Sequence, residues 1–308
     1  MAGRIQFYTM DDETRKQLLQ AGRIAGEARD YGRKLITEGA RAVDILDQVE
    51  DFITSKGAGI AFPAQISINS VAAHQCSDDD DKTTIEASDV VKLDVGAHVN
   101  GFIGDTALTV NLDGQYKELL EASKKALKNA STMFRPGVKV GEIGEVIQET
   151  IKEYGYSPIR NLSGHGLDSY QIHTSPNIPN VKQQDSITLE EGMTVACEPF
   201  ATDGKGAINE SGQATVFSLT GTKQVRSKFG REVLGKLKGY NGLPFTTRWL
   251  TRSLGKGKAM FGLKELQRAG IVHAHPPLKE IGNGMVSQHE HSFIVGDKPT
   301  ITTKLDED

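Results

Sequence analysis

The sequence predicts an α+β fold in which a central antiparallel sheet carries helices on its outer faces. The chain has 308 residues and 37% hydrophobic content, enough to bury one large core. Amphipathic helical patterns recur in both halves of the chain, and two β-rich runs meet at an Asn-Gly pair at 100–101. Asn-Gly between such runs is the strongest short-range signal for a β-hairpin. We therefore expect a single domain spanning residues 1–308.

Two helices are predicted before the first strand and two more after the hairpin. The first begins with Thr9 and Asp12 as a capping box and carries an apolar stripe at helical spacing. The expected elements, in chain order, are helices at about Thr9 to Ile36 and Val43 to Ser55, a strand near Phe62 to Val71, the hairpin, and helices near Tyr116 to Phe134 and Val140 to Tyr154.

The two helix pairs look like copies of one unit. A shift of 98 positions superposes Gly39 on Gly137 and Gly57 on Gly155, with apolar positions matching between them. Any two amphipathic helices align somewhere, so chance is an alternative explanation. The same shift also brings His74 to within one residue of His173. We infer a pseudo-symmetric domain with a site where its halves meet.

Composition argues against several classes of protein. No run of 18 apolar residues occurs, and the first eight residues lack the apolar stretch of a signal peptide. Cys76 and Cys197 are the only cysteines, which is too few for a disulfide scaffold. We expect a soluble, cytoplasmic, monomeric protein without a membrane segment, in which both cysteines pack as small apolar side chains without a catalytic role.

The hairpin brings two carboxylates together. With the turn at 100–101, Asp94 should face Ala107 and Asp105 should face Gly96, so both carboxylates lie on one sheet face as diagonal neighbours. Two carboxylates that point at one place repel each other unless cations lie between them. Gly96 is expected to leave that space open. An exposed strand face with two acidic residues that bind nothing is the alternative.

Three further segments supply matching donors. His165 lies between two glycines, which allows close approach to a ligand. Glu198 and Glu290 each occur in an otherwise apolar strand, where a carboxylate is seldom buried without a partner.

This ordered set of donors, each in its own motif, resembles the metal ligands of the methionine aminopeptidases along nearly the whole chain. The resemblance implies the pita-bread fold and the compact archaeal form of the type II enzymes. It implies two divalent metal ions, Co, Mn, Fe(II) or Zn, with Asp105 and Glu290 bridging them. Asp94 would chelate one ion, and His165 with Glu198 would complete the other. Glu198 would also transfer the proton of the attacking water to the departing amine.

The same resemblance assigns the substrate contacts. His74 and His173 match the family's two histidines that are not metal ligands, and would contact the substrate carbonyl or stabilise the oxyanion. Phe62, Ile172 and His275 are nominated for the apolar pocket, although some relatives carry Tyr at the position of His275. The implied substrates are the N-termini of nascent polypeptides, with a small second residue.

A basic helical insert is expected at residues 222–270. It holds seven Lys and five Arg against two Glu, a formal charge of +10, which leaves −14 for the rest of a chain whose net charge is −4. We expect this insert to dock on ribosomal RNA; a solvated helical face is the alternative. The acidic run from Asp78 to Lys82 is expected to be a solvated loop.

Two other functions compete. An X-Pro peptidase of the same fold has the same five ligand types, but such relatives usually carry a separate N-terminal domain, whereas the first helix here begins almost at once. A non-catalytic pita-bread protein that binds the ribosome or nucleic acid typically lacks metal ligands, whereas all five are retained here.

Overall fold

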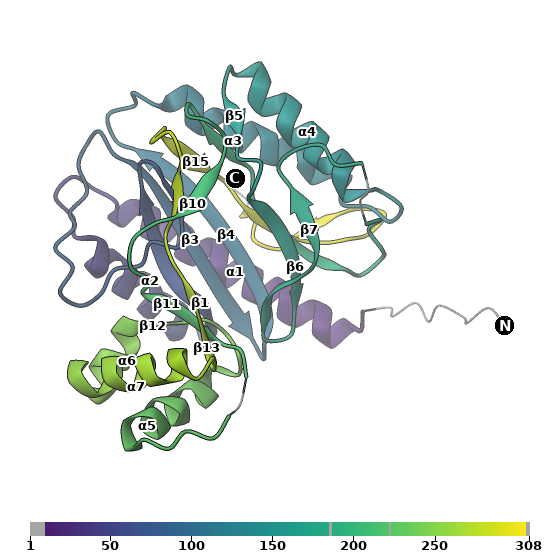
Figure 1. Ribbon diagram of the computed structural model, residues 1–308. Helices are drawn as coiled ribbons and strands as arrows, with labels where there is room; N and C mark the ends of the chain where they lie inside the picture. Colours follow the sequence, from purple (N-terminus) through teal and green to yellow (C-terminus); the bar gives the residue numbers. More distant parts are fainter. Residues whose placement is uncertain (1–9, 185–186, 222, 306–308) are drawn as a thin grey trace.

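The computed structural model describes residues 10–184, 187–221 and 223–305, and it has the expected α+β architecture (Figure 1). Strands occupy the middle of the molecule, helices α1 to α4 lie outside them, and helices α5 to α7 gather at one end. Within the described ranges, no helix combines the length and apolarity that a membrane crossing requires.

Helix α1 (Asp12–Leu35) packs across the central hairpin. Its N-cap is Asp11, whose carboxylate accepts a hydrogen bond from the Thr14 amide at 2.7 Å. The expected capping box of Thr9 and Asp12 is therefore wrong, because Asp12 is already helical, and Thr9 itself lies outside the described residues. Asp11 fits the preference of N-caps for a short acceptor side chain.

The first sheet consists of β1 (Gly59–Ile68), β3 (Val90–Val99) and β4 (Phe102–Asn111), in the order β1-β3-β4. The turn has φ of 51° at Asn100 and 93° at Gly101, which are the left-handed values that an Asn-Gly hairpin turn requires. The predicted register is confirmed: Asp94 pairs with Ala107 and Asp105 with Gly96.

The second sheet has five strands in the order β17-β16-β8-β6-β7. A single bridge between Ala107 and Glu290 joins it to the hairpin. Its strands are β6 (Ser163–Asp168), β7 (Gln171–Pro179), β8 (Thr194–Cys197), β16 (His291–Ile294) and β17 (Thr300–Ile301). Two small sheets lie beside it, one of β2 (Val71–Ala73), β10 (Ile208–Glu210) and β14 (Leu278–Glu280), the other of β5 (Ser157–Pro158), β9 (Phe200–Thr202) and β15 (Val286–Gln288).

The internal repeat is present in the fold. Helices α2 (Ala42–Ser55) and α4 (Val140–Glu153) have equal lengths and begin and end exactly 98 positions apart. The four bracketing glycines all have positive φ, between 78° and 89°. Helix α3 (Lys117–Ala130) is shorter than predicted, because a 3₁₀ turn η1 (Ser131–Met133) follows it.

Helices α5 (Lys228–Leu237), α6 (Thr247–Leu254) and α7 (Lys256–Arg268) form one body with the sheet β12-β11-β13. The strands are β11 (Val216–Leu219), β12 (Phe245–Thr246) and β13 (Val272–His275), and a short 3₁₀ turn η2 (Lys238–Tyr240) follows α5. A separate hydrophobic cluster fills this body, including Phe217, Val233 and Phe245. We call these elements, from Val216 to His275, the insert body.

The acidic loop at 78–82 is not simply solvated, in contrast to the expectation. Asp79 forms an ion pair with Arg252 and Asp80 with Lys256 at 2.6 Å, while Thr247 donates a hydrogen bond to Asp78. The loop therefore packs against the insert body. Opposite charges on two segments far apart in the chain explain this contact, which the local acidity of the loop alone does not reveal.

Replacement of Gly22 by Ala tests the contact between α1 and the rest of the core. A Cβ at this position would lie 2.4 Å from the Thr302 carbonyl oxygen, so we expect a loss of about 1–3 kcal/mol in unfolding free energy. Urea denaturation measures this change. Gly235→Ala in α5 is the matched control, since its Cβ meets no atom within 4 Å, and it should gain about 0.5–1 kcal/mol. Equal effects of the two substitutions would contradict the proposed packing.

Candidate active site

The five candidate metal ligands line one pocket, although they come from five separate segments. Asp94 lies on β3, Asp105 on β4 and His165 on β6, while Glu198 directly follows β8 and Glu290 directly precedes β16. Asp105, His165 and Glu290 each offer an atom within 4.8 Å of the other two. The His165 Nε2 atom is 3.7 Å from Asp105 Oδ2 and 3.7 Å from Glu198 Oε1.

Two of the pocket carboxylates are incompletely hydrogen-bonded. Asp94 Oδ1 and Asp105 Oδ1 have no partner among the described residues. Burial raises the pKa of Asp94 to about 7. The pKa values of Asp105, Glu198 and Glu290 are raised well above their ordinary values, first by burial and then by the charge of neighbouring carboxylates, Asp94 among them. Such a set of oxygen donors with one imidazole fits divalent cations.

Hydrogen bonds around the backbone of Asp105 and Glu290 hold these two candidate metal ligands in place. The Ser292 hydroxyl accepts a hydrogen bond from the Asp105 amide at 2.8 Å and donates one to the Asp105 carbonyl at 2.7 Å. Thr106 donates to the Glu290 carbonyl at 2.7 Å, and the Glu290 amide donates to Ala107 at 2.9 Å. The two sheets are therefore joined exactly where the carboxylates meet.

Gln288 contributes to this site and was not predicted. Its amide nitrogen donates to Glu198 Oε2 at 3.1 Å and to Glu290 Oε2 at 3.4 Å, so it orients both glutamates. The sequence does contain a signal for this role: Gln288 lies two residues before Glu290, and residues i and i+2 of an extended segment lie on the same face.

Gly96 has a different role from the one expected. The space above it is not open, because a Cβ there would lie 2.2 Å from the ring of Phe62. Gly96 lets the Phe62 ring lie against the hairpin, and Phe62 lines the same pocket as the carboxylates.

Three histidines stand beside the carboxylates. The His173 ring lies 4.4 Å from the His165 ring, and the His74 ring lies 5.8 Å from the His275 ring, centroid to centroid. Burial lowers the pKa of His74 to about 3 and that of His275 to about 4, and the neighbouring imidazoles add to the effect. These side chains are therefore neutral at physiological pH and can donate or accept hydrogen bonds.

The nominated pocket residues Phe62, Ile172 and His275 all line this pocket. The insert body supplies Val216 and Pro244 as well, which were not predicted because their segments are distant in the chain. An adjoining groove of about 640 Å³ shares five residues with the pocket, namely Ala73, His74, His165, His173 and Glu198. A polypeptide could thus place one side chain in the pocket while its continuation lies in the groove.

Both cysteines are buried. Burial raises the pKa of the Cys76 thiol to about 11 and raises that of Cys197 further. Protonated buried thiols are poor nucleophiles and poor metal ligands. The absence of a catalytic role for either cysteine stays a prediction.

Residues 16–225 match the model of metallopeptidase family M24, and the chain belongs to this family. Within it the chain belongs with the methionine aminopeptidases: it is 45% identical to the methionine aminopeptidase of Archaeoglobus fulgidus over 96% of this chain and 100% of the relative.

Solved structures support the fold. The structure of a methionine aminopeptidase from Thermotoga maritima matches with a TM-score of 0.70 at 21% identity, covering 97% of this chain and 100% of the other. A thermophilic Arx1 matches with a TM-score of 0.85 at 16% identity, covering 97% and 95%. The expected pita-bread fold is confirmed.

The raised carboxyl pKa values predict how pH affects the metal-free protein. A carboxyl group whose pKa is raised by folding stabilises the native state below its unfolded pKa, near 4, and this stabilisation is lost as pH rises through the folded pKa, about 7 for Asp94. Unfolding free energy should therefore fall between pH 4 and pH 7, and less steeply in Asp94→Asn. Chemical denaturation of chelated protein at several pH values measures the slope.

Asp297→Asn, in an exposed loop, is the control for this measurement and should keep the wild-type slope. Added divalent metal should flatten the wild-type dependence, because cations then replace the protons. Identical slopes for wild type and Asp94→Asn would contradict the assignment.

Proposed function

We propose that this chain removes the N-terminal methionine from nascent proteins and peptides in a metal-dependent hydrolysis. The observation that carries the proposal is that five metal-type donors and several apolar side chains line one pocket, which adjoins a groove. Full-length similarity to methionine aminopeptidases supports the same substrate.

Asp94, Asp105, His165, Glu198 and Glu290 would hold two divalent ions. When bound, such ions supply Lewis-acid activation of water and of the substrate carbonyl. The unpartnered oxygens of Asp94 and Asp105 support this assignment. A carboxylate-rich set with one imidazole accommodates Co, Mn, Fe(II) or Zn.

The chain's own residues have distinct proposed roles. Glu198 is the proton carrier, because Gln288 binds one of its oxygens and leaves the other near His165. His74 and His173 border both the pocket and the groove, so they are placed to donate to the carbonyl oxygen of the bond being cleaved. Their neutral state gives each an N–H without an added charge.

The pocket explains a preference for methionine. Phe62, Ile172, Val216 and Pro244 offer apolar contacts to an unbranched side chain, and His275 is held by a 2.9 Å hydrogen bond between Ser218 and its Nε2. A small second residue of the substrate would fit beside His74 and His173, where the pocket meets the groove.

A peptide panel tests this function. Chelated protein to which Mn, Fe(II), Co or Zn is restored should cleave Met-Ala-Ser and leave Ala-Pro intact, as measured by release of the free amino acid. Cleavage of Ala-Pro alone would support an X-Pro peptidase instead. Cleavage of neither peptide with any of the four metals would favour the non-catalytic binding protein.

We also propose that the insert body binds ribosomal RNA through its exposed basic residues. Two of the five arginines of the insert are engaged within the protein, since Arg248 is fully buried and Arg252 pairs with Asp47 and Asp79. Lys228, Lys236 and Lys238 remain exposed on α5 and η2 and are the better candidates. Exposed cations in one segment support a polyanionic partner.

Ribosome co-sedimentation at low and high salt tests the RNA contact. Replacement of Lys228, Lys236 and Lys238 by Glu should abolish co-sedimentation at low salt, because it reverses three charges of the surface. The matched control reverses the exposed Lys16, Lys124 and Lys128 outside the insert body and should leave binding unchanged. Binding that does not weaken with salt would contradict the proposal.

A further inference from the structure

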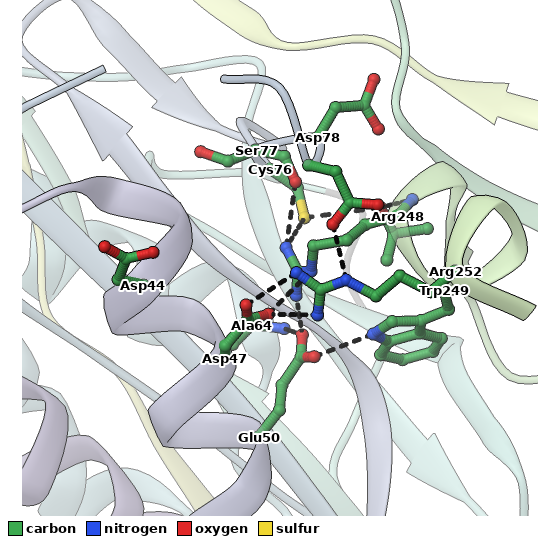
Figure 2. A network of polar contacts seen from close by, with 12 residues as sticks. Asp44, Asp47, Glu50, Ala64, Cys76, Ser77, Asp78, Arg248, Trp249 and Arg252 are labelled. Atoms are coloured by element: carbon green, nitrogen blue, oxygen red, sulfur yellow. Dashed lines mark hydrogen bonds and ion pairs between the residues drawn. The ribbon is translucent and has the colours of Figure 1, made fainter. Parts of the chain in front are cut away.

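A buried ion pair joins the insert body to the rest of the molecule (Figure 2). Arg248, at the start of α6, is 0% exposed, and Glu50, on α2, is 6% exposed. Their Nη2 and Oε1 atoms are 2.6 Å apart, although the residues are 198 positions apart in the chain. The neighbouring Trp249 donates its indole N–H to the other Glu50 oxygen at 2.8 Å.

Glu50 also holds the strand that carries part of the pocket. The regular pairing of β1 with β3 is interrupted between Phe62 and Gln65, where Pro63 has no N–H to donate. The Ala64 amide donates to Glu50 Oε1 at 3.2 Å instead. The irregular stretch that places Phe62 and Gln65 in the pocket is therefore attached to the same carboxylate that binds Arg248.

Arg248 holds a second pocket segment with its other terminal nitrogen. Its Nη1 donates to the Ser77 carbonyl at 3.0 Å, and its Nε lies 3.1 Å from Asp47 Oδ1. Ser77 is three residues after His74, whose amide donates to Gln65 Oε1 at 2.8 Å. The guanidinium thus connects α2 with the segment that follows the pocket histidine.

Neighbours of Arg248 reinforce this segment. The Thr215 hydroxyl donates to the Cys76 carbonyl at 2.6 Å, and the Cys76 thiol donates to the Thr246 hydroxyl at 3.7 Å. Thr215 precedes Val216 and Thr246 follows shortly after Pro244, so the parts of the insert body that reach the pocket are fastened beside His74.

We propose that Arg248 is a positioning residue for the pocket that receives the first side chain of the substrate. Its guanidinium fixes three walls of that pocket relative to one another: Phe62 and Gln65 on β1, His74, and Val216 with Pro244 from the insert body. It touches neither substrate nor metal. The inference rests on the proposed function, because the pocket is defined by that substrate.

The planar guanidinium explains why arginine is required. The Nη2 atom of the guanidinium binds Glu50 while Nη1 reaches the Ser77 carbonyl. A lysine ammonium is a single point charge that cannot bind both groups. Arg248→Lys keeps a buried cation opposite Glu50 and removes the bridge. Glu50→Leu combined with Arg248→Met removes both charges, so no uncompensated charge is buried.

The experiment measures kcat and KM for peptides that begin with Met, norleucine or Leu, each followed by Ala-Ser. The measurements use metal-loaded protein at a temperature where circular dichroism shows the variant folded. Arg248→Lys should raise KM for the Met peptide roughly tenfold to a hundredfold, because small displacements of substrate contacts are costly. The ratio of kcat/KM for the Met peptide to kcat/KM for the peptide with the branched Leu should decrease. The double variant should behave in the same way.

Arg268→Lys and Arg268→Met, on the exposed last turn of α7, are the matched controls and should retain wild-type kinetics. A purely structural role would lower the melting temperature but leave KM and the Met-to-Leu preference of the folded protein unchanged. That result for Arg248→Lys, even if the double variant does not fold, would overturn the inference. Wild-type protein that cleaves no Met peptide would instead overturn the proposed function.

Discussion

Mutual repulsion among buried carboxylates is the constraint on which the rest of the structure depends. Asp94, Asp105, Glu198 and Glu290 approach one another in one pocket. Burial raises the pKa of all four, and the charge of neighbouring carboxylates raises those of Asp105, Glu198 and Glu290 further. In such a place carboxylates remain ionised only if cations or hydrogen-bond donors compensate them. Gln288 compensates part of the charge, and oxygens of Asp94 and Asp105 are left without a partner in the described structure. The site is therefore organised to receive positive charge.

The fold brings these groups together by joining two similar halves. The α2 and α4 units are offset by 98 residues, and the sheets of the two halves meet at the bridge between Ala107 and Glu290. One half supplies the hairpin aspartates and the other supplies His165 and the glutamates. The insert body then closes the pocket from the side. Its docking uses charge complementarity, so part of its basic character belongs to the architecture of the protein and not to an external partner.

Local patterns in the sequence predicted local geometry well. The Asn100-Gly101 turn fixes the hairpin register, because its backbone conformation selects a two-residue loop. The repeated glycines predicted matching helices, because Gly57 and Gly155 each follow a helix and end it with a positive φ. Contacts between distant segments were not predictable in this manner. The ion pair of Glu50 with Arg248 spans 198 positions, and the Phe62 ring covers Gly96 because β1 lies beside β3, a pairing that no local pattern specifies.

The proposed function depends on five side chains from five segments that would hold a pair of divalent cations. Crystals grown with Mn²⁺ and measured with anomalous X-ray scattering near the manganese edge test it most directly. Two anomalous peaks are expected in the pocket, both contacted by side chains from the set Asp94, Asp105, His165, Glu198 and Glu290. A pocket without an anomalous peak, or metal bound only elsewhere on the surface, would contradict it.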